Sequence, residues 1–171
     1  MFKLPIPDIL LTNIYELKPD MLVARGVSLL LMDLDNTLDT YHAQGPGVSL
    51  RNWIDALKRA GIEPFIYSNS HGDRAMRFAD ALGIDYVNKA KKPKTKRLFA
   101  LLREKNVRPA NAAIIGDQIY TDVLCGSCAG ILTIAIRPLD LSNPFHYLRY
   151  GAEMPFRLAY KRKNNVKEKK D

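Results

Sequence analysis

The sequence is poor in cysteine and histidine, with two cysteines and three histidines among 171 residues. Cys125 and Cys128 form a C-x-x-C pair, but a zinc site would need two further ligands, and the chain has no second C-x-x-C and no paired histidines. A redox pair usually begins a helix directly after a strand. These two residues are predicted to lie inside a helix that begins near Thr121, so we interpret both as small buried thiols.

Long apolar runs are also absent from the sequence. No stretch reaches the roughly 18 to 20 consecutive apolar residues that span a bilayer. Two prolines and an aspartate interrupt residues 1–8, which lack the apolar centre of a secretory signal. We therefore expect a cytoplasmic protein. The length is sufficient for one domain with a hydrophobic core, and the hydrophobic fraction of 47 % is ordinary for a globular chain.

Positive charge, in contrast, is abundant. The net charge is +8, and six of the 26 lysines and arginines lie in residues 161–171. A basic tail of this kind suggests an anionic partner, either phospholipid or nucleic acid, and the alternative is a solvated terminus that only aids solubility. Residues 144–160 mix aromatic with basic side chains, as segments at membrane interfaces do. Single-stranded nucleic acid binds to similar surfaces.

Short apolar runs alternate with helical patterns along the chain. Such alternation predicts an α/β fold with a mainly parallel sheet and helices on both faces. One helix is predicted from a cap at Ser49 to a stop at Gly61, with apolar side chains at helical spacing between them. The predicted strands cover residues 29–34, 64–68, 84–87, 112–116 and 131–136.

Three further helices are predicted between these strands. One begins at Ser70 or Asp73, includes the apolar residues Met76 and Phe78, and ends at Gly83. The next begins at Pro93, a residue suited to a first helical turn, and includes the apolar residues Leu98 and Phe99. The last covers roughly 121–129 and ends at Gly130.

Polar side chains collect where four of these strands end. Ligands bind beyond the carboxyl ends of the strands in open parallel sheets, so these groups are expected to share one site. Two carboxylates one residue apart suit a hard divalent cation, with one carboxylate free to attack a substrate. The groups, in chain order, are Asp33 and Asp35; Ser68-Asn69-Ser70; Lys91-Lys92-Pro93-Lys94; and Gly116-Asp117-Gln118 with Asp122 beyond it.

These motifs together resemble those of the haloacid dehalogenase (HAD) superfamily of phosphohydrolases. The match consists of D-x-D-x-T from Asp33 to Thr37, Ser68, Lys92 before proline, and G-D-x-x-x-T-D from Gly116 to Asp122. Over about residues 5–140 the chain resembles subfamily IIIA, with its YqeG-like proteins and the phosphatidylglycerophosphate phosphatases of mitochondria and plastids. The resemblance implies a Rossmann-like fold, Mg²⁺ dependence and hydrolysis of a phosphomonoester.

The resemblance also implies roles for the acidic residues. Asp33 would attack phosphorus and form an aspartyl-phosphate. Asp35 would protonate the leaving alcohol and then deprotonate the attacking water. Asp33, the backbone carbonyl of Asp35 and Asp117 would bind Mg²⁺. Asp122 would support the metal through water or pair with the motif lysine, and Thr37 would close the turn after Asp35.

The remaining motif residues would bind the phosphate of the substrate. Ser68 and the backbone amide of Asn69 would hydrogen-bond the phosphoryl oxygens. Lys92 would neutralise the phosphate and keep two neighbouring aspartates ionised. Lys92 is favoured because it directly precedes proline. Lys91 and Lys94 are interpreted as a solvated basic loop or as contacts to a second phosphate of the substrate.

The intervals between the motifs are short. About 35 residues separate Asp33 from Ser68, and about 24 separate Ser68 from Lys92. Neither interval holds more than one helix and its loops, so the protein is predicted to be capless, with a site that is open or covered by a neighbouring subunit. His42 and His71 lie in these intervals and are interpreted as surface or loop histidines.

Two classes of function remain open. The first is a Mg²⁺-dependent phosphatase acting on phosphatidylglycerophosphate or a similar anionic lipid, peripheral on the inner face of the membrane, or else on soluble sugar or nucleotide phosphates. The second is a HAD-fold protein that binds RNA or a scaffold, with vestigial hydrolysis. Nucleic acid is the less favoured partner because no RNA-recognition motif occurs, and a homo-oligomer is compatible with the sequence.

The chain is divided into three predicted parts. A HAD-like phosphatase domain covers residues 1–140, an aromatic and basic segment packs on it over 141–160, and a basic, disordered tail covers 161–171. Apolar side chains within residues 6–17 are expected to pack against the domain's own sheet.

Overall fold

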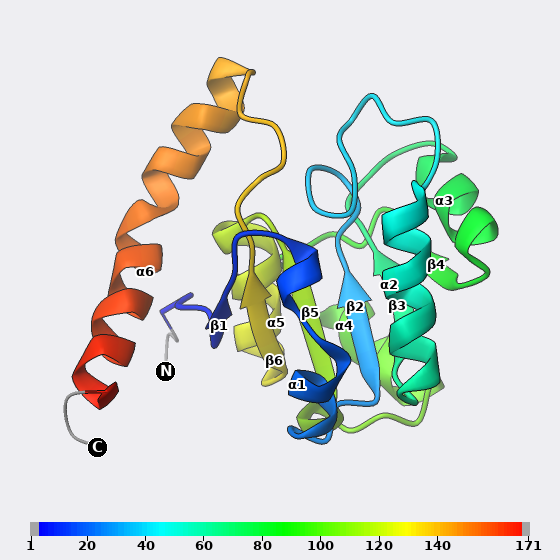
Figure 1. Ribbon diagram of the computed structural model, residues 1–171, viewed down its shortest axis with the longest axis horizontal. Helices are drawn as coiled ribbons and strands as arrows, with labels where there is room; N and C mark the ends of the chain where they lie inside the picture. The colour runs from blue at the N-terminus through cyan, green and yellow to red at the C-terminus, as the bar shows by residue number, and fades with distance from the viewer. Residues whose placement is uncertain (1–3, 169–171) are drawn as a thin grey trace.

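A computed structural model describes residues 4–168, with side chains up to residue 162. Its centre is a six-stranded sheet in the order β1-β6-β5-β2-β3-β4, with helices on both faces (Figure 1). Every neighbouring pair of strands is parallel, as the alternation of strands and helices predicts. The strands are β1 (Ile9–Leu10), β2 (Leu29–Met32), β3 (Glu63–Tyr67), β4 (Asp85–Val87), β5 (Ala112–Gly116) and β6 (Leu132–Ala135).

The central strands β2 and β5 are buried along their whole length. Both are continuous apolar runs, because a parallel strand covered on both faces has no solvent side. Leu31 of β2 pairs with Ile114 of β5 on one side and with Phe65 of β3 on the other. This register places the ends of β2 and β5 at the same level, so the residues that follow them become neighbours.

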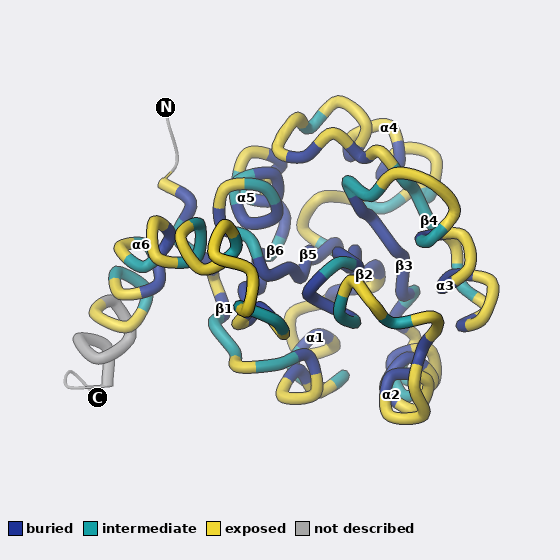
Figure 2. The backbone as a smooth tube through the Cα atoms, turned by 90° about the horizontal axis from the view of Figure 1, so that it is seen from above, coloured by how far each residue is buried: buried dark blue, intermediate teal, exposed yellow. Residues whose placement is uncertain are grey.

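Two layers of helices cover the sheet. Leu30 and Met32 of β2 pack in one core with side chains from α1, α2 and α3, whereas Leu29 and Leu31 pack in a second core with α4 and α5. Figure 2 shows α1 and α2 on one side of the sheet and α4 and α5 on the other. The helices are α1 (Pro19–Val23), α2 (Val48–Arg59), α3 (Arg74–Leu82), α4 (Lys96–Glu104), α5 (Leu124–Ala129) and α6 (Pro144–Glu168).

Several helix ends differ from the predictions. Gly47 rather than Ser49 precedes the first residue of α2. α4 begins at Lys96 instead of Pro93, because residues 91–94 form a turn closed by the Lys94 amide on the Lys91 carbonyl. The end of α3 is as predicted, with Gly83 in the left-handed region at a φ of 58°.

Not every apolar residue of these helices lies in the core. Met76 on α3 and Phe99 on α4 each keep 39 % of their surface in contact with solvent. The neighbouring Phe78 and Leu98 are buried.

The segment before β2 belongs to the sheet and its core. β1 pairs with β6 through Ile9↔Ile134, and Ile14 and Leu17 are buried in the same core as β2. The prediction that this apolar segment packs on the domain's own sheet is confirmed. The Asp8 carboxylate strengthens the junction because it accepts hydrogen bonds from the amide and hydroxyl of Thr133.

α6 lies along the β1 edge of the molecule (Figure 1). It runs across the boundary predicted at residue 161, and the backbone of residues 161–168 continues the helix. Residues 169–171 of the predicted tail lie outside the described residues. Among the helices of residues 4–168, none combines the length and the apolar character that crossing a bilayer requires.

The cysteine prediction is half right. Both residues lie inside α5, as expected, and Cys125 is buried under the Lys94 carbonyl. Cys128, three residues further along the helix, is exposed.

Candidate active site

Asp33 is the first residue after β2 and stays in the sheet, since its amide donates to the Ile115 carbonyl of β5 at 2.9 Å. Its side chain is buried against Lys92. The Lys92 ammonium donates at 2.6 Å to Asp33 Oδ1 and at 2.6 Å to Asp122 Oδ1. A single lysine thus bridges carboxylates that follow two neighbouring strands.

Asn69, after β3, holds the backbone of Lys92 in place. Its side-chain oxygen accepts from the Lys92 amide at 2.8 Å, and its side-chain nitrogen donates to the Lys92 carbonyl at 3.0 Å. Ser68 is buried beside it, and its hydroxyl accepts from the Ser70 amide at 3.1 Å. Lys91 and Lys94 are exposed, so of the three clustered lysines Lys92 is the one that contacts the carboxylates.

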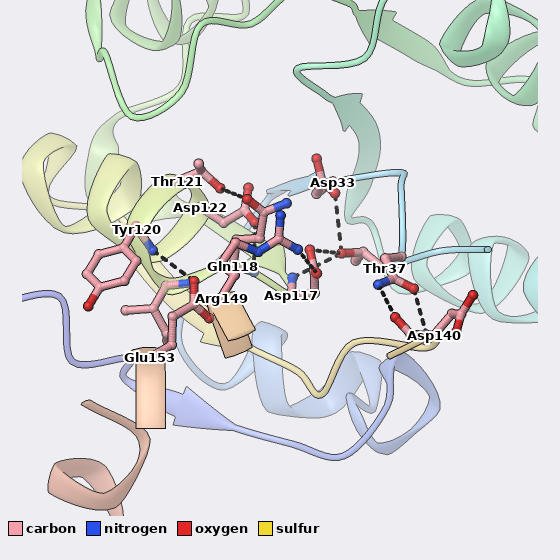
Figure 3. Close-up of polar contacts among 12 residues, drawn as sticks. Asp33, Thr37, Asp117, Gln118, Tyr120, Thr121, Asp122, Asp140, Arg149 and Glu153 are labelled. Atoms are coloured by element: carbon pink, nitrogen blue, oxygen red, sulfur yellow. Dashed lines mark hydrogen bonds and ion pairs between the residues drawn. The ribbon is translucent and has the colours of Figure 1, made fainter. Parts of the chain in front are cut away.

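Thr37 connects the two acidic strand ends. Its hydroxyl lies 3.3 Å from Asp117 Oδ1 and 3.4 Å from Asp33 Oδ2, and it accepts from the Asp117 amide at 3.0 Å (Figure 3). Thr37 therefore holds Asp117 against the end of β2, which is a supporting role.

Gly116 makes room for Asp122 beneath the end of β5. A Cβ at position 116 would lie 2.2 Å from the Asp122 carboxyl carbon, so the approach requires glycine. Asp122 is further held by the Gln118 amide, which donates to its Oδ2 at 3.2 Å. Its other oxygen pairs with Lys92 at 2.6 Å, which is one of the two roles expected for Asp122.

Three buried carboxylates meet at this point. Oxygens of Asp33, Asp117 and Asp122 lie within 4.8 Å of one another, which is a spacing that one cation can bridge. Burial, followed by the negative charge of Asp33, raises the pKa of Asp117 well above its usual value. Burial also raises the pKa of Asp122 to about 6, although Lys92 opposes that rise. The ammonium of Lys92 and the guanidinium of Arg149 face three acids, so negative charge is in excess and an oxygen-liganded divalent cation fits this site.

The Asp35 side chain pairs with an arginine outside the carboxylate cluster. This arginine is Arg74, the first residue of α3, whose Nε lies 2.8 Å from Asp35 Oδ1. The same guanidinium donates at 2.6 Å to the carbonyls of Thr40 and Ala43, and so ties the loop after β2 to α3. Burial raises the pKa of Asp35, and Arg74 partly offsets the rise.

Four charged residues at the site were missed in the sequence. Arg74 opens α3, while Arg149, Glu153 and Arg157 lie on α6. Arg149 reaches Asp117 Oδ2 at 3.4 Å, and Glu153 accepts from the Ile119 amide at 2.9 Å (Figure 3). Their spacing of four residues was the available signal, because it places all three α6 side chains on one helix face.

The histidines in the motif intervals behave as predicted, since His42 and His71 are both exposed. The third histidine contacts the loop after β2. His146 of α6 stacks on Tyr41, with ring centroids 5.1 Å apart. This contact joins the start of α6 to the loop after β2.

Comparisons with known proteins agree with this geometry. A family model described as haloacid dehalogenase-like hydrolase matches residues 46–130. A Bacillus subtilis protein described as probable phosphatase YqeG is 33 % identical over 163 residues, which cover 94 % of each chain.

Solved structures share the fold. A protein of Corynebacterium glutamicum described as uncharacterized matches with a TM-score of 0.54 and 20 % identity over 73 % of this chain and 96 % of that one. The cobalt-bound deoxy-D-mannose-octulosonate 8-phosphate phosphatase of Haemophilus influenzae matches with a TM-score of 0.52 and 19 % identity, over 64 % of this chain and 68 % of its own.

Proposed function

The chain belongs to the haloacid dehalogenase-like hydrolases, and from this premise we propose that it is a Mg²⁺-dependent phosphomonoesterase whose nucleophile is Asp33. The observation that carries the proposal is the position of Asp33 at the end of β2, buried beside Lys92 and within one cation's reach of Asp117. Phosphoryl transfer depends mainly on positioning and charge stabilisation, and this small set of groups supplies both.

Asp33 is the group that attacks phosphorus. Lys92 holds its Oδ1 at 2.6 Å, while Oδ2 has only the longer 3.4 Å contact with Thr37 and is the freer oxygen. As the bond from Asp33 to phosphorus forms, the bond from phosphorus to the alcohol oxygen breaks. Water then attacks the aspartyl-phosphate, which releases phosphate and regenerates the carboxylate.

Asp35 transfers the proton in both steps. It gives a proton to the departing alcohol and then takes one from the attacking water. Its raised pKa, caused by burial, favours the protonated form that the first step needs. Arg74 fixes the orientation of the carboxyl group through its 2.8 Å contact.

The remaining groups bind the cation and the phosphate. Asp33, the backbone carbonyl of Asp35 and Asp117 would hold Mg²⁺, which would neutralise phosphoryl charge. Ser68, the Asn69 amide and Lys92 would bind the phosphoryl oxygens. The Asn69 side chain is already engaged with Lys92, so it serves this set by positioning the ammonium.

Replacement of the nucleophile tests the proposal. Asp33→Asn should lower kcat by about 10³-fold or more, because the amide cannot form the aspartyl-phosphate. Phosphate release from a soluble monoester with Mg²⁺ measures the effect, and Asp55→Asn, an exposed site on α2, is the matched control. A variant that retains turnover would remove Asp33 from this role. A wild-type protein that releases no phosphate but binds RNA with a steep salt dependence would favour the binding-protein alternative.

For the substrate we propose phosphatidylglycerophosphate or a similar anionic lipid phosphate, met by a cytoplasmic enzyme at the inner face of the membrane. Phe145 and Leu148 on α6 keep 69 % and 73 % of their surface exposed, next to Arg149 at the site. Exposed apolar groups beside basic ones suit a membrane interface. Between Asp33 and Ser68 the chain forms only a loop, α2 and β3, so no inserted domain excludes a lipid.

Vesicle binding tests this substrate class. The double variant Phe145→Ser/Leu148→Ser should weaken binding to vesicles containing phosphatidylglycerol by about tenfold, since two apolar side chains no longer leave water. Sedimentation with vesicles measures it, and Val48→Ser on α2, equally exposed, is the control. Equal binding by all three proteins, with faster hydrolysis of sugar or nucleotide phosphates than of the lipid in micelles, would favour a soluble substrate.

A further inference from the structure

Three charged side chains form a row along α6. Arg149, Glu153 and Arg157 are spaced four residues apart and therefore lie on one face of the helix. Each of them contacts the loop that follows β5, between Asp117 and Tyr120. The catalytic steps proposed above use none of the three.

Glu153 caps the turn that carries Asp122. Its Oε1 accepts from the Ile119 amide at 2.9 Å and from the Tyr120 amide at 3.4 Å. These amides begin the π-helical turn η3 (Ile119–Val123) and would otherwise lack partners. Because Glu153 is 1 % exposed, the carboxylate acts as a buried anchor rather than as a surface charge.

Arg157 fixes the other end of the same loop. It donates from Nη2 to the Asp117 carbonyl at 2.6 Å and from Nη1 to the Ile136 carbonyl at 2.9 Å, thereby joining the residues after β5 and β6. Its guanidinium lies 3.5 Å from Glu153 and is 3 % exposed. Both peptide atoms of Asp117 are thus held by side chains, the amide by Thr37 and the carbonyl by Arg157.

Charge separates this pair from the third member of the row. Glu153 and Arg157 neutralise each other, so together they add little net charge near the carboxylates. Their contribution is instead to hold the loop after β5 in position. The Arg149 guanidinium, in contrast, lies 3.4 Å from Asp117 Oδ2, and a positive charge at that position disfavours the binding of a metal ion there. We propose that Glu153 and Arg157 are positioning residues that set the affinity of the Asp117 site for its divalent cation.

This inference rests on the proposed function only in that Asp117 binds Mg²⁺. Partners that orient a metal ligand typically change metal affinity about 10- to 100-fold when they are removed. A pair that merely fastened α6 to the sheet would instead alter the unfolding temperature, and the folded protein would bind the metal as before.

The test is Mg²⁺ binding to the metal-free protein by titration calorimetry, well below the unfolding temperature. The variant Glu153→Gln/Arg157→Leu removes both charges together, so neither is left buried alone. Its Kd for Mg²⁺ should rise at least about tenfold. The amides of Ile119 and Tyr120 should also exchange hydrogen faster. Arg162→Leu, an exposed position on the same helix, should keep the wild-type Kd.

A second variant guards against failure of the double variant to fold. Arg157→Lys keeps the charge and one donor, and its Kd should lie between those of the wild type and the double variant. Folded variants that bind Mg²⁺ with the wild-type Kd would overturn the inference while leaving the proposed function intact. A wild-type protein that binds no Mg²⁺ would instead overturn the metal site itself.

Discussion

Two lysines of this chain have the same contacts and opposite surroundings. Lys92 and Lys105 each place their ammonium 2.6 Å from two carboxylate oxygens. The partners of Lys92 follow the carboxyl ends of β2 and β5, and its side chain is 1 % exposed. Lys105 is 20 % exposed, and its partners lie at the amino ends of two strands.

The acids around Lys105 are in water. Glu63 begins β3 and Asp85 begins β4, and their side chains are 43 % and 68 % exposed. The hydrogen bonds that Lys105 donates to Asp85 and Glu63 raise the pKa of Lys105. Solvent and salt screen these charges, so a pair of this kind contributes little. At Lys105, the contact distance of 2.6 Å therefore belongs to a surface ion pair that adds little to stability.

The acids around Lys92 cannot be screened in that way. Burial would lower the pKa of Lys92, but Asp122 and Asp33 together outweigh it and raise that pKa. In a medium of low dielectric these interactions are strong, and each buried charge depends on the others. Burial, more than contact distance, separates a site that can stabilise a phosphoryl group from a surface pair.

Among substitutions at these two ion-pair clusters, removal of Lys92 should have the largest effect on stability and activity. Lys92→Met leaves Asp33 and Asp122 buried without a counter-charge, which costs about 3–5 kcal/mol of unfolding free energy. It should also lower kcat by about 10²-fold or more, because the cation that we propose contacts the phosphoryl group is lost. Urea unfolding and phosphate release measure the two effects. If Lys92→Met retained wild-type kcat, Lys92 would have no part in the reaction.

Removal of one partner rather than the lysine should have a smaller effect. In Gly116→Ala the new methyl group would displace Asp122, so Lys92 keeps only Asp33. Overpacking of this kind costs about 1–3 kcal/mol, which thermal unfolding measures. The matched control is Gly151→Ala on α6, where a Cβ meets nothing within 4 Å. Equal unfolding temperatures for the two variants would contradict the close approach of Asp122.

The exposed lysine should give the smallest effect. Lys105→Met should lower the unfolding free energy by about 0.2–1 kcal/mol and leave phosphate release unchanged. Because the pKa of Lys105 is raised in the folded state, its stabilisation is fully present below the unfolded pKa of about 10.4 and lost as pH rises beyond the folded value. Urea unfolding at pH 8 and above pH 11 should show the difference shrinking. A difference that stayed constant with pH would show that the two ion pairs are not its cause.

Most of the sheet and the carboxylate positions could be predicted from the sequence. β2 and β5 are continuous apolar runs, and Asp33 and Asp117 follow them directly. The apolar run that predicts each strand therefore also places the carboxylate at the end of that strand. The pairing of Lys92 with Asp122 could be offered only as one of two alternatives, because it joins segments 30 residues apart.

What could not be predicted depends on long-range contacts. β1 has two residues, too few for a recognisable alternation. The charged row on α6 lies in a segment of aromatic and basic side chains that also contains Pro155. That composition is typical of a membrane or nucleic-acid interface, so the sequence did not predict a long helix there. The roles of Glu153 and Arg157 depend on their partners on the loop after β5, which lies more than thirty residues away in the sequence.

The pairing of β1 with β6 has a consequence for the order of synthesis. Leu10 is synthesised more than a hundred residues before its partner Ala135. The strand β1 therefore remains unpaired until β6 has been made, and contacts of such long sequence separation form slowly. Glu153 and Arg157 follow later still, so the loop bearing Asp117 acquires its final support only after residue 157 has been made.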